Sequence, residues 1–143
     1  MDWITETIAI GNHRDAQDVK LLAAEGIRSI VCLDGCLAGT TEEALGVEAI
    51  EVFLLIDGPG NRDDLFRQAV LEIGELSRKV PRLLVHCHAG RSRSVVAVAA
   101  HLMHVNGWGP TQALRYVTAK RESVLTPGIE RLLESSWIAQ RAQ

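Results

Sequence analysis

Apolar and polar positions alternate along the chain in blocks that predict strands separated by helices. Short apolar runs bounded by polar or glycine-containing stretches are typical of buried strands, and apolar residues recurring every three to four positions are typical of helices. The expected strands are residues 4–10, 27–33, 48–56 and 82–86. The expected helices are residues 15–25, a short one after 40–43, then 62–79, 92–106, 110–121 and 127–141. Alternating strands and helices followed by a helical tail predict an α/β fold: a mostly parallel central sheet of four to five strands, flanked by helices.

Residues that start and stop helices support these boundaries. Gly26 follows the first expected helix, and Thr40 and Glu43 have the spacing of a capping box. Pro110 and Pro127 suit the first turns of the last two helices, where the missing N–H of proline costs no hydrogen bond.

Composition limits the classes of protein that need to be considered. The 143 residues are 47% hydrophobic and 23% charged, which suits one globular domain spanning residues 1–143. We expect neither a membrane span nor a secretory leader. The net charge of −3 disfavours a broad nucleic-acid footprint. Three cysteines, an odd number without paired spacing, indicate a reducing, cytoplasmic location.

The stretch from 85 to 94 carries the most chemistry. Cys87 directly follows the expected strand 82–86, Gly90 comes three residues later, and Arg93 and Ser94 open the next apolar helix. A short loop between a strand end and a helix start gathers backbone N–H groups around one point, which forms a site for an anion. An ordinary buried thiol needs no such loop. We therefore expect a nucleophile beneath a bound oxyanion.

Each residue type in this loop suits phosphoryl transfer to sulfur. The helix N-terminus, the loop amides and Arg93 all favour the thiolate form of Cys87. Arg93 can offer two parallel donors to phosphate oxygens, which lysine cannot. We expect Gly90 to permit a tight turn and close approach to the oxyanion, and Ser94 to assist departure of the sulfur. The residues expected to hold phosphate are His88, Ala89, Gly90, Arg91, Ser92 and Arg93.

Expulsion of the alcohol or phenol requires a proton donor. Asp57 follows an apolar run and precedes Gly58-Pro59-Gly60-Asn61, so its carboxyl can reach over the site on a movable loop. Asp64 is the second candidate, although Asp63 and Asp64 are better placed to start the helix 62–79. Asp34 follows another strand and is expected to cap a turn. We therefore assign the acid to Asp57.

The loop resembles a known active site. His86-Cys87, five residues, then Arg93-Ser94 is similar to the loop of the cysteine-dependent protein tyrosine phosphatase superfamily, and the dual-specificity branch fits best. The start of the chain (Ile8–Asn12) and Thr126-Pro127-Gly128 resemble the same branch, so the resemblance covers nearly the whole chain. The Cys-His-Ala-Gly-Arg-Ser-Arg-Ser run is also similar to the loop of a member that acts on phosphatidylglycerophosphate.

The resemblance implies the cysteine phosphatase fold, with the acid some thirty residues before the cysteine, which agrees with Asp57. It places Arg121 beside the pocket, where some relatives bind a second phosphate; the alternative is a solvated charge at a helix end. From the residues themselves, His86 is interpreted as tying down the loop and His88 as a surface residue that adds positive charge.

Metal and redox roles are the alternatives for the remaining polar residues. His86, Cys87 and His88 could be read as metal ligands, and so could His101 and His104 as a pair. The arginines of the loop would repel a cation there, and a pair such as His101 and His104 is more often partly buried in a helix with hydrogen-bond partners, so we expect no metal and no organic cofactor. The cysteines at 32 and 36 end a strand that can pass under the site. Either could form a reversible disulfide with oxidised Cys87, although an inert core role suits the first of them better.

The residues predict a phosphatase that works through a cysteinyl-phosphate, and the resemblance implies the dual-specificity type, which acts on phosphotyrosine, phosphoserine and phosphothreonine. The chain is only 4% aromatic, which disfavours a deep, aromatic-clamped phosphotyrosine pocket. One alternative is a phosphatase of lipid phosphates or other small molecules, for which Arg91 adds a cation. Another is a phosphate-binding module without turnover. The expected partners are phosphorylated substrates, with no nucleic acid and no membrane insertion, and we expect a monomer.

Overall fold

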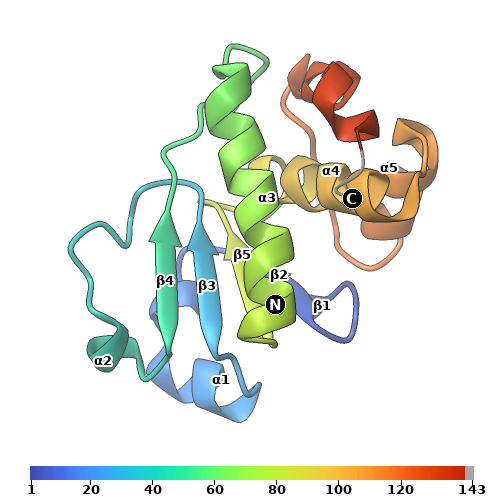
Figure 1. The fold of residues 1–143 in the computed structure, drawn as a ribbon. Helices are drawn as coiled ribbons and strands as arrows, with labels where there is room; N and C mark the ends of the chain where they lie inside the picture. The colour runs from blue at the N-terminus through green and yellow to red at the C-terminus, as the bar shows by residue number, and fades with distance from the viewer. Residues whose placement is uncertain (141–143) are drawn as a thin grey trace.

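A five-stranded sheet forms the centre of the computed structural model, which describes residues 1–140 (Figure 1). The strands are β1 (Asp2–Trp3), β2 (Ile8–Gly11), β3 (Ser29–Cys32), β4 (Ala49–Val52) and β5 (Leu83–His86). They lie in the order β1-β2-β5-β3-β4, and all pairs are parallel except β1 with β2. The prediction of a mostly parallel sheet of four to five strands is confirmed.

Helices cover both faces of this sheet. The α-helices are α1 (Val19–Ala24), α2 (Glu42–Leu45), α3 (Asp63–Lys79), α4 (Arg93–Asn106) and α5 (Pro110–Thr118). Short 3-10 helices span Asp15–Gln17, Ile129–Glu134 and Ser136–Ala139. No helix within residues 1–140 is both long and apolar enough to cross a bilayer.

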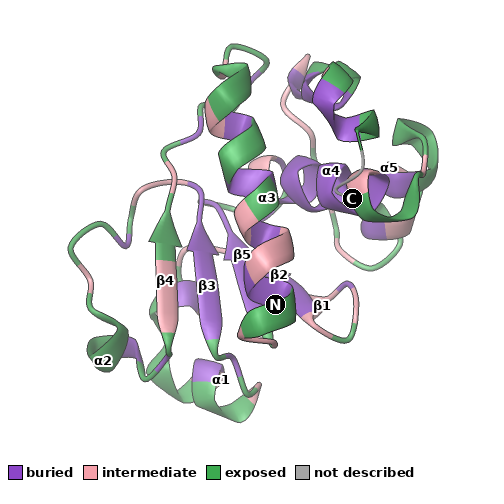
Figure 2. Ribbon diagram, viewed as in Figure 1, coloured by how far each residue is buried: buried purple, intermediate pink, exposed green. Residues whose placement is uncertain are grey.

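Alternation along each strand divides the core into two parts. In β3, Val31 packs with α3 and α4 on one face, whereas Ile30 and Cys32 pack with α1 and α2 on the other. In β5, Val85 and Leu84 divide in the same way. Figure 2 shows the consequence for the helices: α4 is buried along most of its length, whereas α3 alternates buried and exposed positions.

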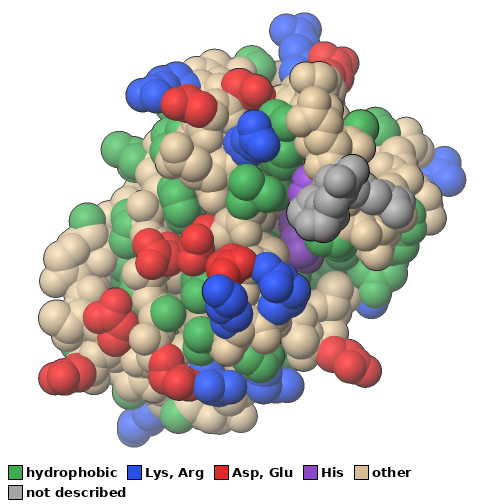
Figure 3. All heavy atoms as spheres, in the orientation of Figure 1, with side chains coloured by type: hydrophobic (Ala, Val, Ile, Leu, Met, Phe, Trp, Pro, Cys, Tyr) green, Lys and Arg blue, Asp and Glu red, His purple; other side chains and the backbone are tan. Residues whose placement is uncertain are grey.

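The outer face of α3 is charged, as an amphipathic helix requires. Glu75 pairs with Arg78 and with Lys79 near the end of the helix. On the face drawn in Figure 3, acidic and basic side chains are accordingly interspersed.

Several boundary predictions were wrong. The expected helix 15–25 is the 3-10 helix Asp15–Gln17 followed by α1, the expected strand 48–56 ends with β4 at Val52, and the expected helix 110–121 ends with α5 at Thr118. Residues 4–10 form no continuous strand, because the Thr5 hydroxyl accepts the N–H groups of Thr7 and Ile8 and turns the chain into a hairpin. The predicted helix 127–141 is two 3-10 helices, and its last residue lies outside the described residues. The cap of α2 is Thr41, whose hydroxyl accepts from Ala44 N, and not Thr40.

Candidate active site

The loop from 87 to 92 lies where ligands bind to parallel sheets, at the carboxyl end of a central strand. β5 ends at His86, between β2 and β3, and α4 begins at Arg93. Ser92 precedes α4, but its hydroxyl accepts from Thr126 N at 3.0 Å instead of capping its own helix. The first N–H groups of α4 are therefore left to face an anion.

Cys87 and Ser94 form a buried pair in this loop. The Cys87 Sγ and Ser94 Oγ atoms are 3.3 Å apart, and the two residues are 2% and 0% exposed. At this distance the two groups form a hydrogen bond, so the hydroxyl can stabilise negative charge on the sulfur. The catalytic role of Ser94 itself stays a prediction.

The guanidinium of Arg93 has one nitrogen in a hydrogen bond and one buried nitrogen without a partner among residues 1–140. Its Nη1 donates to the carbonyl of Leu55 at 3.2 Å, which ties α4 to the segment that leads to Asp57. Its Nε is buried and has no hydrogen-bond partner within residues 1–140. A buried donor of this kind costs free energy until an acceptor arrives, and a phosphate oxygen is such an acceptor.

A cavity of about 300 Å³ brings the predicted residues together. Its lining residues are Asp57, Cys87, His88, Ala89, Arg91, Ser92, Arg93 and Val124. The sequence thus located every lining residue except Val124, an apolar wall that no motif signals. Gly90 is in the loop but is absent from the described lining.

The segment around Asp57 is held by a residue that sequence reasoning missed. Asn61 Oδ1 accepts from Ile56 N, and Asn61 Nδ2 donates to the carbonyls of Ile56 and Gly58, at 2.7 to 3.0 Å. These contacts close the turn and leave Asp57 exposed at its tip. Its position in the pocket agrees with the predicted acid, whose role stays a prediction.

The other candidate carboxylates lie elsewhere. Asp34 caps a turn, as expected, by accepting from Cys36 N at 3.0 Å. Asp63 and Asp64 stand in the first turn of α3, where Asp63 accepts from the Ser135 hydroxyl at 2.6 Å.

Gly90 is required for the expected tight turn and for a second reason, its contact with β2. It has φ of 68°, so the tight turn is confirmed. A Cβ at this position would lie 2.4 Å from the Gly11 carbonyl oxygen, so the loop also approaches the neighbouring β2 closely here, while the expected approach to the oxyanion stays a prediction.

Arg121 braces the loop, which neither expectation for it described. Its Nε donates to Gly90 O at 2.9 Å, its Nη2 donates to Ala89 O at 3.3 Å, and its Nη1 pairs with Asp2 at 3.1 Å. The side chain is only 11% exposed, so it is not a solvated charge. The three contacts use three of its five N–H groups, and Arg121 is not among the described residues that line the cavity, so its expected role in binding a second phosphate gains no support.

The loop histidines behave differently from each other. His88 is exposed, as expected, and its ring stacks on that of His13 with centroids 4.2 Å apart. His86 is fully buried, and its Nδ1 lies 3.2 Å from Cys87 O, which holds the loop on one side. Burial lowers the pKa of His86.

The predicted redox partners of Cys87 stay untested. Cys32 is buried and Cys36 is exposed. Burial raises the pKa of the Cys32 thiol, and burial together with Asp34 raises that of Cys36 to about 12.

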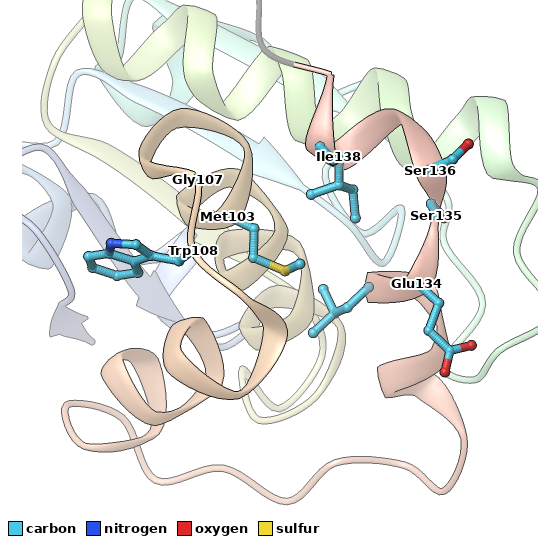
Figure 4. Close-up of a pocket in the computed structure, with 9 residues that line it drawn as sticks. Met103, Gly107, Trp108, Glu134, Ser135, Ser136 and Ile138 are labelled. Atoms are coloured by element: carbon cyan, nitrogen blue, oxygen red, sulfur yellow. The ribbon is translucent and has the colours of Figure 1, made fainter.

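A second cavity, of about 380 Å³, lies between the end of α4 and the 3-10 helices (Figure 4). Met103, Trp108 and Ile138 contribute to its walls. Among its described lining residues there is no member of the cysteine loop, so it is separate from the candidate active site.

Comparison with known proteins agrees with this geometry. Residues 16–134 match the family model for the dual specificity phosphatase catalytic domain. Human dual specificity protein phosphatase 22 is 31% identical over 136 residues, 94% of this chain and 72% of that protein. Human phosphatidylglycerophosphatase and protein-tyrosine phosphatase 1 is 30% identical over 120 residues, 76% and 58% of the two chains. A mouse putative dual specificity phosphatase, crystallised with zinc tungstate, gives a TM-score of 0.79 at 25% identity over 97% of this chain and 86% of that one. The chain belongs to the dual-specificity branch of the cysteine-dependent protein phosphatases.

Proposed function

We propose that this phosphatase cleaves phosphomonoesters in two steps, with Cys87 as nucleophile and Asp57 as acid and then base. The observation that carries the proposal is the shared cavity, which Asp57, Cys87 and Arg93 line together. In the first step the Cys87 sulfur attacks phosphorus while the P–O bond to the substrate breaks. Asp57 gives its proton to the departing oxygen, and Arg93 with the loop amides holds the phosphoryl oxygens.

In the second step water attacks the phosphorus of the cysteinyl-phosphate. Asp57 takes a proton from this water, the P–S bond breaks, and inorganic phosphate leaves. Ser94 lies 3.3 Å from the sulfur and stabilises the thiolate as it departs.

Phosphorylated proteins are the proposed substrate class, with phosphoserine and phosphothreonine accepted as well as phosphotyrosine. No phenylalanine, tyrosine or tryptophan stands among the described residues that line the cavity, whose apolar contacts come from Ala89 and Val124. Such walls offer little selection for a phenyl ring over a shorter side chain.

A lipid phosphate is the second candidate substrate. Arg91 lines the cavity and is half exposed, so it can contact a second anionic group, and its pairing with Glu122 is long at 3.9 Å. One relative is named for activity on phosphatidylglycerophosphate as well as on phosphotyrosine. We also propose a cytoplasmic location, supported by the three unpaired cysteines in the described structure.

The test is phosphate release from a panel of substrates by the wild type, Cys87→Ser and Asp57→Ala. The panel holds phosphotyrosine, phosphoserine and phosphothreonine peptides, phosphatidylglycerophosphate, phosphoinositides and a nucleoside monophosphate. We expect release from all three peptide classes and loss of release in Cys87→Ser. Release that is undiminished in Cys87→Ser would refute the mechanism, and release confined to lipids would refute the protein substrate. Asp57→Asn, which keeps the shape and removes the acid, controls for the truncation to alanine.

A further inference from the structure

Four metal-ligand side chains meet on the face of the sheet opposite to Cys87. Cys32 ends β3, His86 ends β5, and these two residues are direct neighbours in the parallel β3–β5 pair. Asp34 and Cys36 follow in the turn after β3. One ligand atom of each of the four residues lies within 4.8 Å of the other three. None of the four is among the described residues that line the cavity of Cys87.

The imidazole of His86 has one ring nitrogen in a hydrogen bond and the other without a partner among residues 1–140. Its Nδ1 lies 3.2 Å from Cys87 O, and a carbonyl oxygen only accepts, so Nδ1 carries the proton. The lone pair is then on Nε2, which is buried and has no hydrogen-bond partner within residues 1–140. Histidines that bind metals commonly donate their other ring N–H to a backbone carbonyl in this way. The Nε2 lone pair is therefore available to bind a metal ion.

The turn after β3 is already arranged around the same point. Asp34 Oδ1 accepts from Cys36 N at 3.0 Å and lies 3.3 Å from Cys32 Sγ. These contacts hold the carboxylate, the Cys32 thiol and the backbone of Cys36 on the side of His86. Cys36 is exposed and Asp34 is half-buried, so an ion can enter from the surface without passing the catalytic pocket.

We propose that Cys32, Asp34, Cys36 and His86 form a structural zinc site behind the phosphate loop. Two sulfurs, one imidazole nitrogen and one carboxylate oxygen make a four-donor set suited to tetrahedral Zn²⁺, whereas Mg²⁺ and Ca²⁺ require oxygen ligands. Zinc–ligand lengths place such donors about 3.3–3.8 Å apart, so Cys32 Sγ and Asp34 Oδ1, at 3.3 Å, already have this spacing, and the widest pairs, which lie within 4.8 Å, need to close by at most about 1–1.5 Å. The two cysteine thiols lose their protons to solvent on binding.

This zinc would act on the fold and not on the reaction. It joins the end of β3 to His86, whose Nδ1 bonds the backbone of Cys87. The ion would therefore fix the start of the phosphate loop from behind and stabilise the folded chain by its binding free energy.

The test measures zinc binding in the Cys87→Ser background, which removes the catalytic thiol as a competing ligand and makes the result independent of activity. The reduced, chelator-treated protein is titrated with Zn²⁺ against a chromogenic chelator, and with Co²⁺ as a spectroscopic probe. We expect one Zn²⁺ per chain, intense tetrahedral cobalt bands, a thiolate-to-cobalt charge-transfer band, and a melting temperature that rises with zinc.

Variants at the exposed part of the cluster keep the test independent of folding. Adding Cys36→Ser or Asp34→Asn lowers the zinc affinity by about 100-fold or more and abolishes the rise in melting temperature. Asp64→Asn, a matched change at an exposed carboxylate, leaves both unchanged. The proposal is overturned if the reduced protein binds no zinc, if Cys36→Ser binds it unaltered, or if cobalt gives an octahedral spectrum without the charge-transfer band.

Discussion

Replacing Arg121 with methionine tests whether the loop needs its brace. The change keeps the aliphatic stem and removes the donors to Gly90 O and Ala89 O, together with the pairing to Asp2. A hydrogen bond from a charged group contributes about 1.5–3 kcal/mol. The 3.3 Å contact is weaker than the 2.9 Å one, and Asp2 is 47% exposed, so that pairing adds little. We expect the change to destabilise the ordered conformation of the loop by about 2 kcal/mol.

A loss of this size changes the balance between the ordered and loosened loop about 30-fold, since 1.4 kcal/mol is a factor of ten. We therefore expect kcat/KM toward an aryl phosphate to fall by about 10- to 30-fold, and inorganic phosphate to inhibit more weakly by a similar factor. Arg121→Lys keeps the charge but not the forked guanidinium donors, and its kcat/KM should lie between those of the wild type and Arg121→Met. Arg115→Met, an exposed arginine on α5, is the control and should change neither quantity.

The reasoning is refuted if Arg121→Met keeps the wild-type kcat/KM and phosphate affinity. A different outcome separates the brace from a second phosphate site. If the variant loses activity only on doubly phosphorylated substrates, the guanidinium binds substrate and the contacts to the loop carbonyls are incidental.

Three further predictions concern single residues. Ser94→Ala should lower kcat by about 10- to 100-fold, with a burst of the alcohol or phenol leaving group and little change in kcat/KM, because the hydroxyl assists departure of the Cys87 sulfur in the second step; unchanged kcat in stopped-flow assays would contradict this. Burial lowers the pKa of His101 to about 4 from 6.5. Below pH 6.5 the unfolded chain therefore binds a proton at this residue that the folded chain does not, and the stability of the fold falls as the pH is lowered. Urea unfolding should show that the free energy of unfolding falls by about 3 kcal/mol from pH 6.5 to pH 4, and His101→Gln should remove most of this pH dependence. Gly90→Ala should destabilise the chain by at least about 1–2 kcal/mol in the same unfolding assay, because of its positive φ and the Gly11 carbonyl; unaltered stability would count against that clash.

Local patterns were sufficient for much of the fold and site. The apolar stripe of 62–79 and the run before Cys87 each report on burial within one element, so α3 and β5 lie close to their predicted bounds. The spacing from Cys87 to Arg93 is local too, since a loop of this length must bring both residues to one anion. Asp57 could be predicted because it lies in the loop after a buried strand, and such loops lie at the edge of the sheet where the cavity forms.

Features that depend on distant partners were not predictable. The brace by Arg121 joins residues about thirty positions apart, and nothing in its own segment signals it. The role of Gly90 depends on β2 lying beside the loop. The Cys32–His86 neighbourhood exists only because β3 and β5 pair in that register. Residues 4–10 were misassigned because the Thr5 hydroxyl competes locally for backbone N–H groups.

The central claim is that Cys87 carries the phosphoryl group, and trapping the intermediate tests it most directly. Ser94→Ala is mixed with an aryl phosphate, quenched in acid within one turnover, digested and examined by mass spectrometry. The account predicts a phosphate on the sulfur of Cys87 in an amount equal to the burst, and no phosphorylated peptide in Cys87→Ser. Phosphate found instead on a loop histidine, or a burst with an unmodified Cys87, would contradict it.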